Sequence, residues 1–429
     1  MGHFGTDGIR KKADAFTEEY LYQIADGIAS LGGQKILIGL DPRESGPRIA
    51  RHLTERLLFD GVDVIDVGMV PTPCLSYLTK AYGADYGVML SASHNPPEYN
   101  GVKLFSSDGS KASEGEERTV EAVIDGQKSY TPTKRGTYLS EPEGYRKYLS
   151  FLLNKVAPDL SGLTVALDCA NGATSIIAPE VFLRAGAKVI AYNTETDGKN
   201  INCGCGAMVP EFIAKKSTDP SVDIAFCFDG DGDRVMTAKG GKVYDGDKMM
   251  YLCAKDMKSR GALAGDVVVG TVMSNMGTEV AMKKAGITLI RADVGDKYVS
   301  REMKKGGYNV GGEQSGHMIF ADYAPTGDGI LSGLLVAALA KRVDIAEYDD
   351  IVDYPAINDC IMCTEEQKAR FFAREKEIRE YVSRLTDCRT VVRPSGTEPK
   401  VRILAEAPTE QVAIKRAREI KKFIEEMIL

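Results

Sequence analysis

The chain has 429 residues, of which 43% are hydrophobic and 27% charged, and its formal net charge is −7. This length exceeds what one ordinary core can fill, so we expect three or four domains. The acidic balance gives no support for nucleic-acid binding. The longest apolar stretch, residues 329–340, is too short to span a bilayer. Nine scattered cysteines and the lack of a visible signal peptide predict a cytoplasmic protein with reduced thiols.

Three segments share one order of predicted elements: an apolar strand, a polar loop, an amphipathic helix and a second strand. Each helix ends at an Ala-Gly or Asp-Gly pair. A glycine after the last helical turn is the expected end of a helix. A strand–helix–strand unit of this length predicts parallel pairing through a right-handed crossover. The predicted strand pairs are Lys35–Leu40 with Val62–Ile65, Leu163–Leu167 with Ala187–Ile190, and Asp266–Gly270 with Ile287–Ile290.

The repeated order of strand, loop, helix and strand ends at about Ile357. Glu365–Arg384 predicts one charged helix, Thr390–Arg393 and Lys400–Leu404 predict short strands around a polar turn, and Thr409–Leu429 predicts an amphipathic helix. The predicted fold class is therefore α/β, with three topologically similar α/β domains containing mixed sheets and a C-terminal α+β domain. The predicted domains are 1–153, 154–257, 258–356 and 357–429.

A serine nucleophile follows a buried strand predicted at Tyr86–Leu90. Asn95–Pro97 forms a rigid turn that would hold Ser93 out at the sheet edge. His94 and Lys103 are nearby groups that could move or balance a proton. A surface loop with a helix-capping serine is the structural alternative. No G-x-S-x-G motif surrounds Ser93, which argues against a hydrolase triad.

An acidic loop follows a second apolar run, Ile224–Phe228. In an extended segment Asp229, Asp231 and Asp233 would share one side, and the intervening glycines would let the chain curl. Three carboxylates and a phosphate oxygen suit Mg²⁺. An EF-hand loop is excluded because its sixth position would be Arg234 rather than glycine. An ordinary Asp/Gly turn remains the alternative.

Three further loops could bind a sugar phosphate. Arg393–Thr397 places a guanidinium, hydroxyls and backbone N–H groups around one turn, and Arg402 could add a second positive charge. The alternative is a solvated hairpin turn. Gly311–His317 carries groups able to hydrogen-bond vicinal sugar hydroxyls, although any mobile polar loop would look similar. Phe4–Arg10 could position a phosphate, or it could simply be a frayed N-terminal segment.

These five motifs, in this order, resemble those of the α-D-phosphohexomutases over essentially the whole chain. Within that superfamily they are most similar to the phosphoglucosamine mutase branch, through Phe4–Arg10, Asn200–Asn202, Val294–Asp296 and Gly312–His317. Relatives acting on glucose or mannose phosphates typically have Met where Gln314 stands. The chain departs from the family pattern at Lys11, Ser91, Ala207 and Lys297, where Gly, Thr, Ser and Arg are usual.

The resemblance implies four domains around a central cleft and a phosphoserine at Ser93. It implies Mg²⁺ held by that phosphate together with Asp229, Asp231 and Asp233. The predicted catalytic residues are Ser93, His94, Lys103 and Arg10. The predicted substrate-binding residues are Arg234, Glu313, Ser315, His317, Arg393, Ser395, Gly396, Thr397 and Arg402.

The implied reaction moves a phosphoryl group between O6 and O1 of an aldohexose phosphate, with glucosamine 6-phosphate as the expected substrate. A sugar 1,6-bisphosphate is the implied intermediate and activator. The alternatives are a phosphoglucomutase or phosphomannomutase, a non-catalytic sugar-phosphate sensor and a Mg²⁺-dependent phosphatase. The expected partner is a hexose phosphate, without nucleic acid or membrane, and a homodimer is left open.

Overall fold

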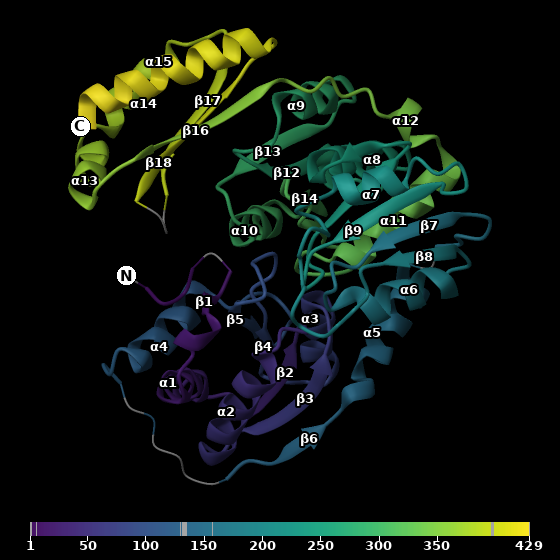
Figure 1. Ribbon diagram of the computed structural model, residues 1–429, viewed down its shortest axis with the longest axis vertical. Helices are drawn as coiled ribbons and strands as arrows, with labels where there is room; N and C mark the ends of the chain where they lie inside the picture. The colour runs from purple at the N-terminus through teal and green to yellow at the C-terminus, as the bar shows by residue number, and fades with distance from the viewer. Residues whose placement is uncertain are drawn as a thin grey trace.

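The computed structural model describes residues 2–5, 7–128, 130, 135–156, 158–395 and 399–428. Within these ranges the chain forms four sheets in succession. Figure 1 shows the four units along an arc, with the N-terminal and C-terminal units at its two ends. In the part of the chain that is described, no helix is long and apolar enough to cross a membrane.

The first unit is a six-stranded sheet with helices on both faces. Its strands are β1 (Ile9–Lys12), β2 (Lys35–Leu40), β3 (Asp63–Met69), β4 (Tyr86–Leu90), β5 (Tyr99–Ser106) and β6 (Tyr138–Ser140). Its helices are α1 (Glu18–Ala29), α2 (Gly46–Phe59), α3 (Thr72–Ala81), α4 (Glu114–Ile124) and α5 (Tyr145–Phe151). Side chains alternate between faces along a strand, so Ile36 and Ile38 pack with α1, α2 and α4, whereas Leu37 packs with α3 and α5.

The second and third units are built in the same way. The second contains β7 (Thr164–Asp168), β8 (Lys188–Tyr192), β9 (Ile224–Phe228), β10 (Val235–Lys239), β11 (Lys242–Tyr244), α6 (Thr174–Arg184) and α7 (Glu211–Lys216). The third contains β12 (Val267–Thr271), β13 (Thr288–Ala292), β14 (Val310–Gly312), β15 (Met318–Phe320), α8 (Gly246–Ser259), α9 (Met276–Lys284), α10 (Asp296–Gly306), α11 (Gly329–Arg342) and α12 (Ile345–Tyr348).

All three units share one strand order. The sheets contain the runs β3-β2-β4-β5, β8-β7-β9-β10 and β13-β12-β14-β15. In each run the first three strands are parallel and the last is antiparallel. The predicted parallel pairs are therefore confirmed. The loops 91–98, 229–234 and 313–317 each follow the third parallel strand of their unit. They are equivalent positions at the carboxyl ends of the strands, where α/β sheets bind ligands.

The fourth unit is an antiparallel sheet in the order β16-β18-β17, covered by helices. Its elements are β16 (Ala356–Met362), β17 (Arg389–Pro394), β18 (Lys400–Glu406), α13 (Glu365–Ala373), α14 (Glu375–Ser383) and α15 (Glu410–Ile428). The prediction of one helix over Glu365–Arg384 is wrong, because the chain leaves helical geometry at Arg374, where φ is −112° and ψ is 11°. This stretch has no glycine or proline that would signal the break.

One apolar core joins the first three units of the molecule. It includes buried side chains from each of them, whereas the fourth unit has a core of its own. Each predicted domain range contains one sheet, except that β16 begins one residue before the last predicted boundary. The boundaries themselves remain predictions.

Candidate active site

Ser93 brings the first two units together. It lies in the loop after β4, is fully buried, and has a positive φ of 52°. Its hydroxyl donates to Asp229 Oδ2 at 2.6 Å, and His94 Nδ1 lies 3.4 Å from the same Oγ. A left-handed conformation costs a residue other than glycine about 1–2 kcal/mol. The surrounding contacts must therefore hold Ser93 in this position.

Arg43 supplies most of those contacts, and the sequence analysis did not identify it. Its buried guanidinium donates to the carbonyl oxygens of Ser93 and Asn95 at 2.8 Å and of Tyr99 at 2.9 Å. It also donates to the carbonyl of Pro96. Arg43 follows β2 at the same sheet edge as the serine loop. Its place at the carboxyl end of a parallel strand was the available signal.

A second set of contacts fixes the same loop. Asp41 Oδ2 accepts from Arg43 Nε at 3.0 Å and from Ser91 Oγ at 2.7 Å, and Ser91 Oγ in turn accepts from the Ser93 N–H at 2.8 Å. From the second unit, Asn202 Nδ2 donates to the carbonyl of Ser93 at 2.9 Å. The backbone of Ser93 is therefore held from both units.

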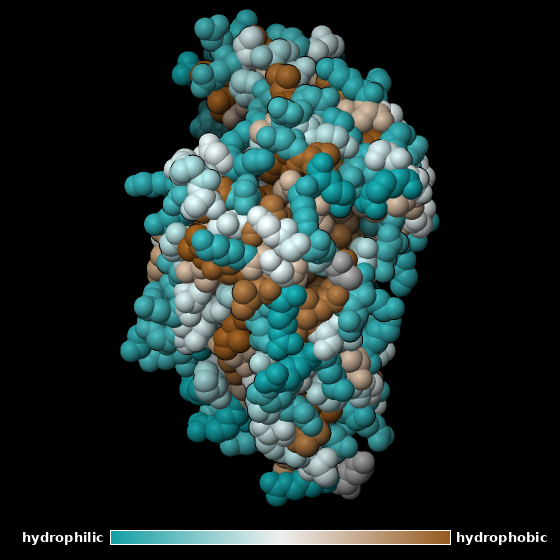
Figure 2. Space-filling model, turned by 90° about the vertical axis from the view of Figure 1, so that its right-hand side faces the viewer, coloured by the Kyte–Doolittle hydropathy of each residue, from teal (hydrophilic) through white to brown (hydrophobic). Residues whose placement is uncertain are grey.

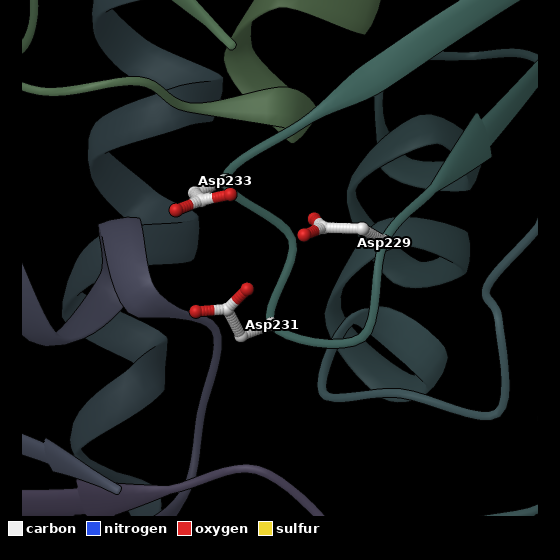
Figure 3. A group of neighbouring side chains, drawn as sticks. All are labelled: Asp229, Asp231 and Asp233. Atoms are coloured by element: carbon white, nitrogen blue, oxygen red, sulfur yellow. The ribbon is translucent and has the colours of Figure 1, made fainter. Parts of the chain in front are cut away.

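Asp229, Asp231 and Asp233 converge as predicted, with one ligand atom from each lying within 4.8 Å of the others. Figure 3 shows the three carboxylates pointing toward a shared space. The expected extended geometry is wrong, since the loop is a turn in which the Gly232 N–H donates to the Asp229 carbonyl and Gly232 has a φ of 71°. At Gly230 a Cβ would lie 2.8 Å from the carbonyl oxygen of Ser93. The close approach of the two loops therefore requires glycine there.

The acidic loop fits a hard divalent cation. All three carboxylates are buried, and within the described ranges Asp231 Oδ1 and Asp233 Oδ1 have no hydrogen-bond partner. Burial and the neighbouring carboxylates of Asp233 and Asp231 raise the pKa of Asp229 well above its usual range. Buried carboxylates in such proximity need a counter-charge. Oxygen-only donors of this kind suit Mg²⁺.

Lys103 supplies part of that charge from the first unit. Its Nζ lies 2.7 Å from Asp231 Oδ2, 3.2 Å from Asp233 Oδ2 and 2.9 Å from Asp7 Oδ2. Burial opposes its charge, but these three carboxylates raise the pKa of Lys103 well above its usual range. Burial and the cations Arg234 and Arg10 lower the pKa of His94 to about 4. At neutral pH Lys103 is therefore an ammonium group and His94 a neutral imidazole.

Arg10 and Arg234 flank the serine with unused donors. Arg10 pairs with Asp7 and donates through Nη1 to Asn95 Oδ1 at 3.4 Å. Among the described residues, the buried Nε atoms of both arginines have no hydrogen-bond partner. Guanidinium donors that lack a partner are suited to an oxyanion such as a phosphate. Asp7 lies in the glycine-rich motif 4–10, but the sequence analysis gave it no role.

The third unit contributes the loop 313–317. Glu313 Oε1 accepts from the Gly295 N–H at 3.0 Å, and Ser315 Oγ donates to Glu313 Oε2 at 3.4 Å. Gln314 Nε2 donates to Asp245 Oδ2 at 3.1 Å. The glutamate is thus held at the start of α10. Its role and that of Ser315 in binding sugar hydroxyls remain predictions.

His317 faces the metal loop rather than open solvent. It is 3% exposed, its Nδ1 lies 3.7 Å from Asp233 Oδ2, and its Nε2 lies 3.4 Å from Asp296 Oδ2. The Gly327 N–H also donates to Nε2, at 3.1 Å. Both ring nitrogens therefore have protein contacts. Direct binding of a sugar hydroxyl by this side chain stays a prediction.

The fourth unit places two arginines opposite each other. Arg393 on β17 and Arg402 on β18 are cross-strand partners, and both line a cavity of about 330 Å³ together with Lys400. Burial and the charge of Arg402 lower the pKa of Arg393. Like charges directly across a sheet are unfavourable unless an anion separates them. Ser395, in the adjacent turn, is buried, whereas the predicted Gly396 and Thr397 lie outside the described residues.

The sequence matches all four domain profiles of the phosphoglucomutase/phosphomannomutase family. The alpha/beta/alpha domains I, II and III match residues 1–131, 144–242 and 245–354, and the C-terminal domain matches residues 362–422. The chain belongs to this family. The predicted superfamily is confirmed, and the protein is an enzyme of the isomerase class, a phosphohexomutase.

Relatives within the phosphoglucomutase/phosphomannomutase family cover nearly the whole chain. The phosphoglucosamine mutase of Bacillus mycoides is 42% identical, covering 96% of this chain and 95% of that protein. The phosphoglucosamine mutase of Bacillus anthracis gives the same figures.

Solved structures of the family share the fold. A family protein from Burkholderia thailandensis aligns with a TM-score of 0.82 at 22% identity, over 98% of this chain and 96% of that one. The N-acetylphosphoglucosamine mutase of Aspergillus fumigatus, solved in complex with GlcNAc-6P and magnesium, aligns with a TM-score of 0.68 at 19% identity, over 99% and 96% of the two chains. The predicted α/β fold is thereby confirmed.

Proposed function

We propose that the protein interconverts glucosamine 6-phosphate and glucosamine 1-phosphate through a phosphoserine at Ser93 and a sugar 1,6-bisphosphate. The observation that carries this proposal is the 2.6 Å hydrogen bond from Ser93 Oγ to Asp229 Oδ2, which puts a nucleophile beside three buried carboxylates. The choice of amino sugar is supported by relatives named phosphoglucosamine mutase at 42% identity. A glucose or mannose phosphate as the main substrate is not favoured.

Asp229, Asp231 and Asp233 would hold Mg²⁺ together with the phosphate on Ser93. The two unpartnered carboxylate oxygens, Asp231 Oδ1 and Asp233 Oδ1, are available to the ion. A bound Mg²⁺ would neutralise charge on the phosphoryl group. Lys103 adds positive charge at the same point, because its ammonium group touches two of the three carboxylates.

The remaining groups orient the phosphoryl group and accept a proton. Arg10 and Arg234, whose buried Nε atoms have no hydrogen-bond partner among the described residues, would donate to the oxygens of the phosphate on Ser93. In the first half-reaction the bond from Ser93 Oγ to phosphorus breaks and a bond to the free sugar hydroxyl forms. The hydroxyl proton passes to a base, and His94 is the candidate because its Nδ1 lies 3.4 Å from Ser93 Oγ. The second half-reaction returns the other phosphate of the bisphosphate to Ser93.

The fourth unit would hold the phosphate that is not reacting. Arg393 and Arg402 offer two adjacent guanidinium groups, and Ser395, which directly follows β17, carries a hydroxyl beside them. The bisphosphate must turn over between the two half-reactions, so either end has to fit this subsite. An anion-binding surface that makes few contacts with the sugar satisfies that requirement.

The test combines intact mass with a comparison of substrates. Purified protein incubated with a sugar 1,6-bisphosphate should gain one phosphate, and Ser93→Ala should gain none and lose nearly all turnover. Ser110→Ala, in the exposed turn after β5, serves as the matched control. With a trace of bisphosphate, turnover of glucosamine 6-phosphate should exceed that of the glucose and mannose esters.

Other outcomes identify the alternatives. Release of inorganic phosphate without an isomeric product would indicate a phosphatase. Binding of a hexose phosphate without phosphorylation of the protein would indicate a sensor.

Assembly and location remain predictions. Figure 2 shows the side that lies to the right in Figure 1, where apolar side chains gather in the middle of the face. On α6, Ile176 and Leu183 are 52% and 62% exposed. A homodimer would be detected by light scattering of the purified protein, and a cytoplasmic location by cell fractionation.

A further inference from the structure

Six charged or titratable side chains form a closed ring around one side of the site. Going round it, acidic and basic groups alternate, and each contacts the next. The order is Asp233, Lys103, Asp7, Lys111, Asp296, His317 and again Asp233.

The ring joins three separate units. Asp7, Lys103 and Lys111 belong to the first unit, Asp233 to the second, and Asp296 and His317 to the third. Each of the six side chains is at most 18% exposed. The fourth unit, which has its own core, contributes none of these six residues. Buried ionic groups depend on their partners, because an unpaired buried charge is costly.

Lys111 closes the ring. Its Nζ contacts Asp7 Oδ1 in its own unit and Asp296 Oδ2 at the start of α10 in the third unit. A second ion pair between these units is looser, since Lys297 Nζ lies 3.8 Å from the exposed Glu114. Exposed pairs of this kind contribute little. The Lys111–Asp296 pair is therefore the stronger ionic link between the two units among these contacts.

We propose that Lys111 and Asp296 are positioning residues, which hold Lys103 and His317 against the metal loop by closing this ring. Asp7 Oδ2 contacts both Lys103 and Arg10, and Asp7 Oδ1 contacts Lys111. Without Lys111, Asp7 would hold Lys103 more strongly and draw it away from Asp231 and Asp233. Without the Asp296 carboxylate, Lys111 would keep Asp7 as its one acidic partner within the ring, and His317 Nε2, which accepts the Gly327 N–H, would lose the side chain that lies 3.4 Å away.

The local packing makes this proposal testable. Lys111 and Asp296 line a cavity of about 530 Å³ between the start of α4 and α10, together with the exposed Lys304. Space beside the pair should let shortened or neutral side chains fit without overpacking. Lys304 lies on the same cavity but outside the ring, so Lys304→Met is a matched control for Lys111→Met.

The experiment is a double-mutant cycle on the full-length chain, with Lys111→Met, Asp296→Asn and the double variant. It is read by the midpoint of urea unfolding and by kcat and KM for the hexose phosphate. We expect each single variant to lower kcat by about 10- to 100-fold with KM within about threefold, because misplacement of a catalytic group by about 1 Å can cost 10²-fold. The double variant should be no slower than the slower single variant, since one break already opens the ring.

Two further variants separate positioning from folding. Lys111→Arg keeps the charge and should retain kcat within about threefold of the unsubstituted protein, and Lys304→Met should match that protein. Losses in the double variant that equal the product of the single losses would overturn the proposal, as would a kcat change below about twofold in both single variants. If Lys111→Met does not fold, Lys111→Gln takes its place in the cycle.

The kinetic part rests on the proposed function, and the unfolding part does not. If the unsubstituted protein has no mutase activity but the unfolding midpoints are non-additive, the proposed function is refuted and the proposed role of the ring is supported. If the unsubstituted protein is active, but the changes in unfolding midpoint add and the kcat losses multiply in the double variant, the proposed role of the ring is refuted and the proposed function stands.

Discussion

Arg43 offers the strongest single test of how the fold prepares Ser93. Arg43→Met removes the donor to four carbonyl oxygens of the loop 93–99 and leaves Asp41 buried without its cationic partner. Asn202 Nδ2 also donates to the carbonyls of Ser93 and Asn95, so those two groups keep one donor. Removing one member of a buried ion pair typically costs ~3–5 kcal/mol. We expect a loss of that size in the free energy of unfolding of the protein.

The same substitution should slow chemistry at Ser93. Ser93 occupies a left-handed conformation that costs about 1–2 kcal/mol, and the contacts of Arg43 to the loop carbonyls offset that cost. Once they are lost, the loop can relax and the 2.6 Å approach of Ser93 Oγ to Asp229 is no longer enforced. The rate at which a sugar 1,6-bisphosphate phosphorylates Ser93 should fall by at least tenfold.

The assay pairs urea unfolding with a time course of intact mass. Arg48→Met is the control, because Arg48 lies on α2 and also donates to two carbonyls, those of Phe16 at 2.8 Å and Ala13 at 2.9 Å, but does not touch the serine loop. In the Arg48→Met variant, Ser93 should become phosphorylated at the same rate as in the unsubstituted protein. The reasoning fails if Arg43→Met also keeps that rate, or if it destabilises the chain less than Arg48→Met does.

Two further predictions concern the metal loop and a buried carboxyl group. Asp231→Asn should raise the Mg²⁺ concentration needed for half-maximal turnover by at least tenfold, because it weakens one of three converging oxygen donors; an unchanged Mg²⁺ titration would contradict this. Burial raises the pKa of Asp328 from 3.8 to about 6, which corresponds to ~3 kcal/mol. Because the folded state favours the protonated carboxyl group, its contribution is complete below about pH 4 and is lost as the pH rises through about 6. The stability of the unsubstituted protein relative to Asp328→Asn should therefore fall between those pH values, and a flat difference would refute the assignment.

The sequence predicted the repeated units and the loops of the site because both depend on local signals. Short apolar runs bounded by turn residues, such as Ile224–Phe228, are typical of buried strands, and glycines such as Gly186 mark where the helices end. Ser93 and the acidic loop each follow such a run directly. Their place at strand ends could therefore be read from the order of residues along the chain.

Tertiary structure alone decided which of these strand-end groups meet. Arg43 holds carbonyl groups about fifty residues further along the chain, and Lys111 joins Asp7 to Asp296 across two units. Periodicity reports whether a side chain is buried, but not which other side chain it faces. That choice depends on how three sheets with one topology pack around a common core, and no local pattern encodes it.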